Sequence, residues 1–160
     1  MTDIIVRDEL ALPAFAIAGL SIRTSNAHAA NAIPALWQRV MAADLPRALA
    51  RWTAPLAITG DEIPLIALYD RYQSDHTGPY DLTVGVPVRD DAGAIEGLVV
   101  RAVPAQRYAR VEAIGPTGVA VFAAWQRVWA ELTPRRAFTS DLEVYRPSRA
   151  DRVELAIALR

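Results

Sequence analysis

The segment RAFTSDLEVYRP, residues 136–147, holds the residue types best suited to bind a charged ligand. In a strand, alternate side chains point to opposite faces, so Leu142 and Val144 share one face and Glu143 and Tyr145 share the other. If Glu143 lies in a covered groove among aromatic rings, its buried carboxylate either takes up a proton or binds a cation, and the rings add cation–π attraction. Alternatively, Glu143 is an exposed charge that protects an edge strand from aggregation. The residues alone favour this second interpretation.

Further aromatic residues are candidates for the wall of such a groove. Tyr72 follows Asp70 by two positions, as Tyr145 follows Glu143, which suggests an equivalent stretch in YDRY. Tyrosine often marks a wet cavity, because its ring is apolar and its hydroxyl needs a partner. Most strand tyrosines are nevertheless ordinary half-buried residues, and core packing is the default role of a tryptophan. The candidate ligand-binding residues are Glu143, Tyr145, Tyr72, Trp37, Trp125, Tyr108 and Tyr69.

Other kinds of site are not predicted. His28 and His76 have no second ligand at metal spacing, and the chain has no cysteine, so we assign no metal site. Ser74, Asp75 and His76 include the residue types of a catalytic triad, but sequence neighbours rarely form one and no nucleophile elbow is present. No glycine-rich phosphate loop occurs. We therefore predict no cofactor and name no catalytic residue.

The tetrapeptide WQRV occurs at residues 37–40 and again at residues 125–128. Around each copy, apolar residues recur at helical spacing and form one stripe. A strand-like run that begins near a Pro-Ala pair precedes each helix, and two more strand-like runs follow it. The sequence thus predicts an internal duplication of a βαββ unit, with a first half at about 10–90 and a second half at about 96–160.

The predicted fold is α+β. Two βαββ units join their strands into one antiparallel-rich sheet with pseudo-twofold symmetry, two main helices on one face, and a groove between the helices. We expect Ser25 or Asn26 to cap the first helix. We also expect residues 97–102 to form a hairpin with the next strand around Pro104. The closing run at 152–160 alternates apolar and other residues, which is typical of a strand.

Length and charge set the broad class of the protein. The 160 residues suit a single domain, residues 1–160, with its own hydrophobic core. A formal net charge of −1 argues against a nucleic-acid binder, which would carry a basic stripe. The N-terminus lacks the pattern of a signal peptide, and no apolar run reaches the roughly 18 residues of a membrane span. We predict a soluble cytoplasmic protein with no direct nucleic-acid or membrane partner, and we leave its oligomeric state open.

The quoted segments resemble the GyrI-like effector-binding domain of the bacterial transcription-activator effector-binding superfamily. Within it, they resemble the stand-alone integron-cassette type of cationic-drug-binding protein. The resemblance extends from about Leu12 to the C-terminus, and its most specific motif is DLEVY, which is similar to the family's Asp-Phe-Glu-x-Tyr with Leu142 at the phenylalanine position. It implies the duplicated βαββ fold. It also implies that Glu143 is the strand glutamate that contacts cationic ligands in related multidrug-responsive regulators.

With the resemblance counted, we expect the chain to bind small amphipathic, cationic organic molecules in an aromatic cleft that holds an acidic residue. Such binding would serve effector sensing or drug sequestration. One alternative is a hydrolase of strained, cyclopropanoid-type electrophiles that uses Glu143 as general acid or base. Another is a protein-binding inhibitor module, such as a gyrase modulator, although the near-neutral charge gives that reading no support.

Overall fold

The computed structural model describes residues 2–160, without the side chain of Asp8. Within this range the chain forms eight strands: β1 (Asp3–Leu12), β2 (Phe15–Thr24), β3 (Leu65–Asp70), β4 (Tyr80–Val88), β5 (Val99–Val103), β6 (Gln106–Ile114), β7 (Ser140–Tyr145) and β8 (Arg152–Ala158). The helices are α1 (Ala29–Ala43), α2 (Leu45–Ala48) and α3 (Thr117–Glu131), and three 3-10 turns lie at Ala57–Thr59, Asp90–Ala92 and Thr133–Arg135.

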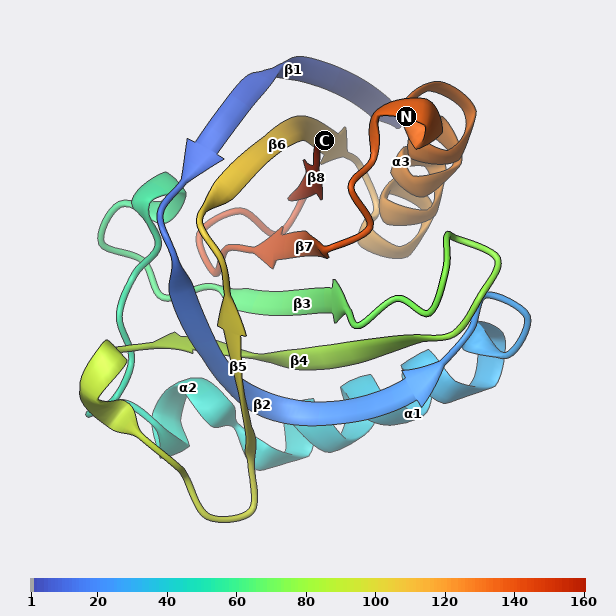
Figure 1. Cartoon of the computed structure of the whole chain (residues 1–160). Coiled ribbons are helices and arrows are strands. Elements are labelled where there is room, and N and C mark those ends of the chain that lie inside the picture. Colours follow the sequence, from blue (N-terminus) through green and yellow to red (C-terminus); the bar gives the residue numbers. More distant parts are fainter. Residues whose placement is uncertain (1) are drawn as a thin grey trace.

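The strands form one antiparallel sheet in the order β1-β6-β8-β7-β3-β4-β2-β5 (Figure 1). This order is symmetric about its middle when β1, β2, β3 and β4 are matched with β5, β6, β7 and β8. A pseudo-twofold axis therefore passes between β7 and β3. The main helices α1 and α3 are each 15 residues long and carry the two copies of WQRV at equivalent positions. The predicted α+β fold with two main helices is confirmed.

The two halves exchange their first strands. β1 pairs with β6 of the second half, and β5 pairs with β2 of the first half. The predicted hairpin around Pro104 is therefore wrong, because β5 is one edge strand and β6 lies next to the opposite edge strand, β1. The β1–β2 and β5–β6 ribbons cross near Pro13 and Pro104, where Leu12 pairs with Gln106 (Figure 1). Proline has no N–H for a ladder, so it suits the point where a ribbon leaves one partner strand and joins another.

Two local features of the first half also differ from expectation. The sequence pattern does not predict β1, because Ile5 and Val6 are both exposed on this edge strand and blur the usual alternation. Helix α1 begins after His28, which makes no side-chain capping bond. The Asn26 side chain instead contacts the second half of the β3–β4 connection, where it donates to the carbonyl of His76. No helix within residues 2–160 is long and apolar enough to cross a bilayer.

Both main helices pack on the same face of the sheet. Glu143 pairs across the sheet with Leu155 in β8 and with Ala67 in β3, so these three side chains share one face. Leu155 belongs to the core beneath α3, and Ala67 belongs to the core beneath α1. The other face has its own core under the crossing ribbons, which includes Leu142 and Val144. The predicted division of β7 into two faces is confirmed.

Strands β2 and β4 contain a directly paired glycine couple, Gly19 and Gly85. A Cβ atom on Gly19 would lie 2.1 Å from the carbonyl oxygen of Val84, and one on Gly85 would lie 2.0 Å from that of Ala18. Both obstacles are backbone atoms, so no flexible side chain can move aside. The absence of a side chain at these two positions is therefore a condition of the pairing.

We predict that Gly85→Ala lowers the free energy of unfolding by about 3 kcal/mol, because the added methyl group must push two strands apart. Urea denaturation measures this change. Gly118→Ala in α3 is the matched control: a Cβ there meets nothing within 4 Å, and alanine favours helix over glycine. Equal stability of Gly85→Ala and the unchanged protein would contradict the close approach.

Candidate functional site

A pocket of about 520 Å³ lies between α1 and α3, at the end of β3 and the start of β4. This volume suits a drug-sized organic molecule. Its wall is mostly apolar and aromatic. Among the described residues that line it, Arg136 is the one arginine, and none is an aspartate or glutamate. The aromatic wall consists of Tyr69, Tyr72, Tyr80, Phe122, Trp125 and Trp129.

Glu143 lies behind this wall. It is 3% exposed and belongs to β7, which is flanked by β8 and β3 in the middle of the sheet. Its Oε2 accepts hydrogen bonds from the Tyr69 hydroxyl at 2.7 Å and from Nε1 of Trp125 at 2.6 Å. Its Oε1 accepts one from the Tyr145 hydroxyl at 2.6 Å. The interpretation of Glu143 as an exposed edge-strand charge is therefore wrong.

The two WQRV tryptophans have matching surroundings. The ring of Trp37 in α1 meets that of Tyr145 in β7, with centroids 5.0 Å apart. The ring of Trp125 in α3 meets that of Tyr69 in β3 at the same distance of 5.0 Å. Both contacts are edge-to-face, the geometry that aromatic quadrupoles prefer. Each helix therefore places its repeated tryptophan against the tyrosine of the other half, and both tyrosines donate to one carboxylate.

The strand registers identify which residues of the two halves are equivalent. When residues 13–14 are matched with residues 104–105, the two Pro-Ala pairs, the strand pairings make Tyr69 equivalent to Tyr145 and Ala67 equivalent to Glu143. Ala67 and Glu143 are also direct cross-strand partners. The pseudo-twofold axis thus passes through this pair, and only one of the two equivalent positions carries a carboxylate.

The predicted equivalence of Asp70 and Tyr72 with Glu143 and Tyr145 is wrong. The side chain of Asp70 lies on the face away from the helices, and Asp70 is the cross-strand neighbour of Asp81. Arg71 then adopts a left-handed backbone with φ of 50°. This residue ends the alternation of β3, and Tyr72, which lies beyond the strand, reaches the pocket from the following loop.

The ionisation of Glu143 reflects its burial. Burial raises the pKa of Glu143 above its usual range, against the opposing effect of the hydrogen bonds from Tyr145, Trp125 and Tyr69. Burial and the neighbouring Glu143 charge raise the pKa of Tyr69 and of Tyr145 well above the usual tyrosine value, so both hydroxyls stay protonated as donors. Three neutral donors thus surround the carboxylate, and no arginine in residues 2–160 forms an ion pair with it.

A second buried polar group, which the sequence pattern does not predict, completes the pocket. Arg136 is 1% exposed, and its Nη2 donates to Oδ2 of the buried Asp141 at 2.8 Å. The same carboxylate accepts hydrogen bonds from the Tyr72 hydroxyl and from the backbone N–H of Ala158. The Arg136 guanidinium carbon lies 4.3 Å from the ring centroid of Phe138. Alternation along DLEVY could have placed Asp141 on the face of Glu143, but nothing local indicates its arginine.

The structure brings six of the seven candidate residues together. Tyr69, Tyr72 and Trp125 line the pocket, while Glu143, Tyr145 and Trp37 form a second row through the contacts described above. Tyr108 does not belong to this site: it is fully buried in the core of the opposite face, where its hydroxyl accepts from Gln106. Tyr108 and its neighbour Ala109 point to opposite faces of β6, and Ala109 packs in the core beneath α3. The described chain holds no group of three His, Asp or Glu side chains that could bind a metal.

We predict that Glu143→Gln removes a pH dependence of stability. The folded state raises the pKa of Glu143 above the usual 4.5, so the stability that it contributes is fully present below the pKa of the unfolded chain and is lost as the pH rises through the folded pKa. At pH 8 the variant should be more stable by about 1 kcal/mol, because a neutral amide avoids the burial of charge.

Urea denaturation between pH 5 and pH 8 tests this prediction. Glu96→Gln, at an exposed position, is the control and should leave the pH profile unchanged. A loss of about 2 kcal/mol or more at pH 8 in Glu143→Gln would mean that the three hydrogen bonds outweigh the cost of burial.

Known proteins share this architecture. The integron cassette protein VCH_CASS2 of Vibrio cholerae is similar over 99% of this chain and 99% of its own, with 26% identity and a TM-score of 0.72. SAV2435, in a structure with bound tetraphenylphosphonium, matches 96% of this chain and 93% of its own with a TM-score of 0.77; at 17% identity, this likeness shows the fold alone.

Sequence comparison gives the family. The Bacillus subtilis (strain 168) protein YobU, named as a candidate transcriptional regulator, is 33% identical over 136 residues, which cover 80% of this chain and 79% of YobU. Residues 10–159 match the family described as Cass2, integron-associated effector binding protein. The chain therefore belongs to the Cass2 family of integron-associated effector-binding proteins.

Proposed function

We propose that this effector-binding protein takes up lipophilic organic cations in the pocket between α1 and α3, with Glu143 as the countercharge. The observation that carries the proposal is a fully buried carboxylate that three neutral donors hold against the back of an aromatic wall. Because burial raises its pKa, the ionised form lacks compensation that a ligand cation would supply.

The charge balance of the site favours a cation. Arg136 and Asp141 form an ion pair, so their formal charges cancel. Ionised Glu143 then leaves the surroundings of the pocket with one negative charge. The ring faces around Arg136 already accommodate a delocalised cation of the chain itself, since its guanidinium lies 5.7 Å from the ring centroid of Trp125 and 5.8 Å from that of Tyr72. The same chemistry suits a bulky organic cation.

The ligand would contact the rings rather than the carboxylate. Glu143 lies behind Tyr69 and Trp125, and both of its oxygens already accept hydrogen bonds. At a separation of roughly 7 Å and an effective dielectric constant of about 20, the attraction between two unit charges is still about 2 kcal/mol. Recognition would then select the sign of charge and apolar area rather than a pattern of hydrogen bonds, which permits many different ligands.

We assign a direct contact role to Tyr69, Tyr72 and Trp125, and a supporting role to Trp37 and Tyr145, which hold the carboxylate and its donors in place. The tetraphenylphosphonium bound to SAV2435 supports this choice of ligand class. The geometry favours binding over the hydrolase alternative, because a general base needs an oxygen free to accept a proton from water. Binding of this kind would serve effector sensing or drug sequestration.

We predict that tetraphenylphosphonium binds to the unchanged protein and that Glu143→Gln weakens this binding about 10- to 50-fold, since the variant loses the attraction of one charge. Quenching of tryptophan fluorescence measures the affinity, because Trp125 and Trp129 line the pocket. Triphenylphosphine oxide, a neutral molecule of similar rings, should bind the two proteins equally. A loss of the same size for both compounds would contradict a role for the charge, and Glu96→Gln serves as the control.

We also predict a pH dependence of cation binding. Affinity for tetraphenylphosphonium should fall as the pH decreases through the raised pKa of Glu143, because the protonated carboxyl no longer attracts a cation. In Glu143→Gln the affinity should be low at every pH. A wild-type affinity that stays constant from pH 8 to pH 4.5 would show that the carboxylate does not contribute.

A further inference from the structure

A second cavity, of about 220 Å³, lies on the opposite face of the sheet from the aromatic pocket. Its floor consists of Glu112 in β6 and Glu154 in β8, which are direct cross-strand partners. Glu154 also pairs with Val144, a member of the core on the face away from the helices. The two carboxylates are largely buried, with side chains 6% and 8% exposed. Like charges in such a position repel each other and require compensation.

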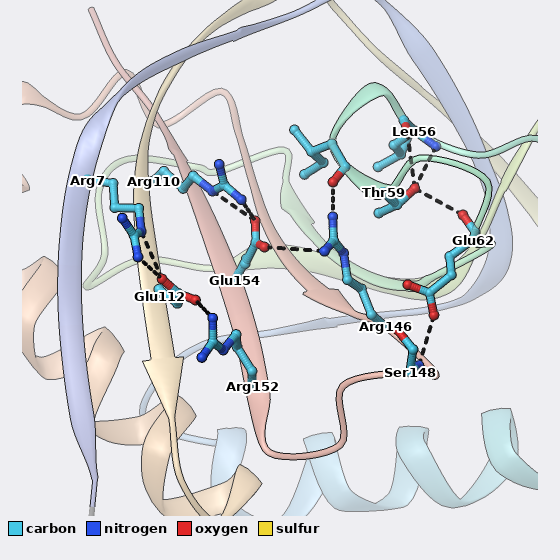
Figure 2. Close-up of polar contacts among 11 residues, drawn as sticks. Arg7, Leu56, Thr59, Glu62, Arg110, Glu112, Arg146, Ser148, Arg152 and Glu154 are labelled. Atoms are coloured by element: carbon cyan, nitrogen blue, oxygen red, sulfur yellow. Dashed lines mark hydrogen bonds and ion pairs between the residues drawn. The ribbon is translucent and has the colours of Figure 1, made fainter.

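Four arginines from different segments provide that compensation (Figure 2). Arg7 in β1 donates through Nε and Nη2 to Oε2 of Glu112, each at 2.8 Å, and Arg152 contacts the other oxygen. Arg110 donates to Oε2 of Glu154 from the neighbouring strand. Burial alone would raise the pKa of Glu112, but the hydrogen bond from Arg7 and the charges of nearby arginines lower it. Glu112 is thus held ionised, and each glutamate pairs with at least one arginine.

The site is also held from the first half of the chain. Arg146, just after β7, donates to the carbonyl oxygen of Ile58 and lies 4.0 Å from Glu154 (Figure 2). Glu62 accepts a hydrogen bond from the backbone N–H of Ser148 at 2.8 Å, which fixes the turn after β7. These contacts hold the arginines in place before any ligand arrives, and such preorganisation favours binding.

Positive charge is in excess at this cavity. Arg149 also lines it and forms no side-chain ion pair with any carboxylate that the structure describes. Among the described side chains, five arginines therefore face three carboxylates even when Glu62 is counted, a difference of two positive charges. The Nε atoms of Arg146 and Arg152 are buried and have no hydrogen-bond partner in the described chain. The planar guanidinium group matches the geometry of phosphate and carboxylate oxygens, and Arg149 is exposed to offer its N–H donors.

We propose that this cavity binds a small oxyanion with two or more negative charges, of the phosphate-ester or pyrophosphate type. The anion would lie at the rim, against Arg149 and the outer edges of Arg152 and Arg7, since the glutamates occupy the floor. The small volume and the acidic floor favour a compact ligand over a long polyanion, which binds along an extended basic stripe. This site is separate from the aromatic pocket, so the chain would bind an anion and a cation on opposite faces.

Calorimetric titration with sodium pyrophosphate at constant ionic strength tests the proposal. The unchanged protein should bind with a Kd below about 1 mM. Arg149→Gln removes no side-chain hydrogen bond or ion pair of the described chain and should weaken binding at least fivefold, as should Arg152→Gln. Arg39→Gln, which removes the same charge from an exposed position on α1, should stay within twofold of the unchanged protein. Equal weakening by all three variants, or no binding by the unchanged protein, would overturn the proposal.

Two further measurements separate the alternatives. Binding of tetraphenylphosphonium should be the same in Arg149→Gln as in the unchanged protein, so the two proposed sites can fail independently. A short DNA duplex should bind no better than pyrophosphate at the same ionic strength. If the duplex binds through Arg149 and pyrophosphate does not, the cavity recognises a phosphodiester backbone and the small-anion proposal is wrong.

Discussion

The burial of one carboxylate in the middle of an eight-stranded sheet constrains the whole molecule. Glu143 needs donors that water can no longer supply, and these come from three elements: Tyr69 from β3, Tyr145 from β7 and Trp125 from α3. Each donor is an aromatic residue, so the groups that satisfy the carboxylate also form or support the wall of the pocket. The hydrogen bonds and the apolar lining are therefore one structure, and a change in helix position would disturb both.

The exchange of β1 and β5 between the halves fixes this arrangement. Because each half completes the sheet of the other, β7 and β3 meet at the centre and their side chains face α1 and α3 together. The core of the opposite face lies under the crossing ribbons, so the pocket side does not have to provide all of the apolar packing. A deep polar group and a hollow of this size can then be present without loss of the fold.

Much of this could be predicted from the sequence, because the relevant patterns are local. Repeated WQRV and apolar periodicity indicated the helices, and alternation divided β7 correctly. Alternation does not say which face of a strand meets the helices, so the residues alone favour the wrong side for Tyr108 and an exposed rather than a buried Glu143. The partners of β1 and β5, and the contact of Arg136 with Asp141, join segments whose association depends on the complete sheet, and no local pattern carries that information.

The pairing of Ala67 with Glu143 at the pseudo-twofold axis has a consequence for how such a site can be encoded. In an assembly of two identical chains, equivalent positions on a true axis carry the same residue, so a glutamate there would face a second glutamate and an alanine would face an alanine. One carboxylate alone at the axis requires two copies of the unit with different sequences in the same polypeptide. Joining two different copies in one chain thus allows a single carboxylate at the axis, where two identical chains would place either two carboxylates or none.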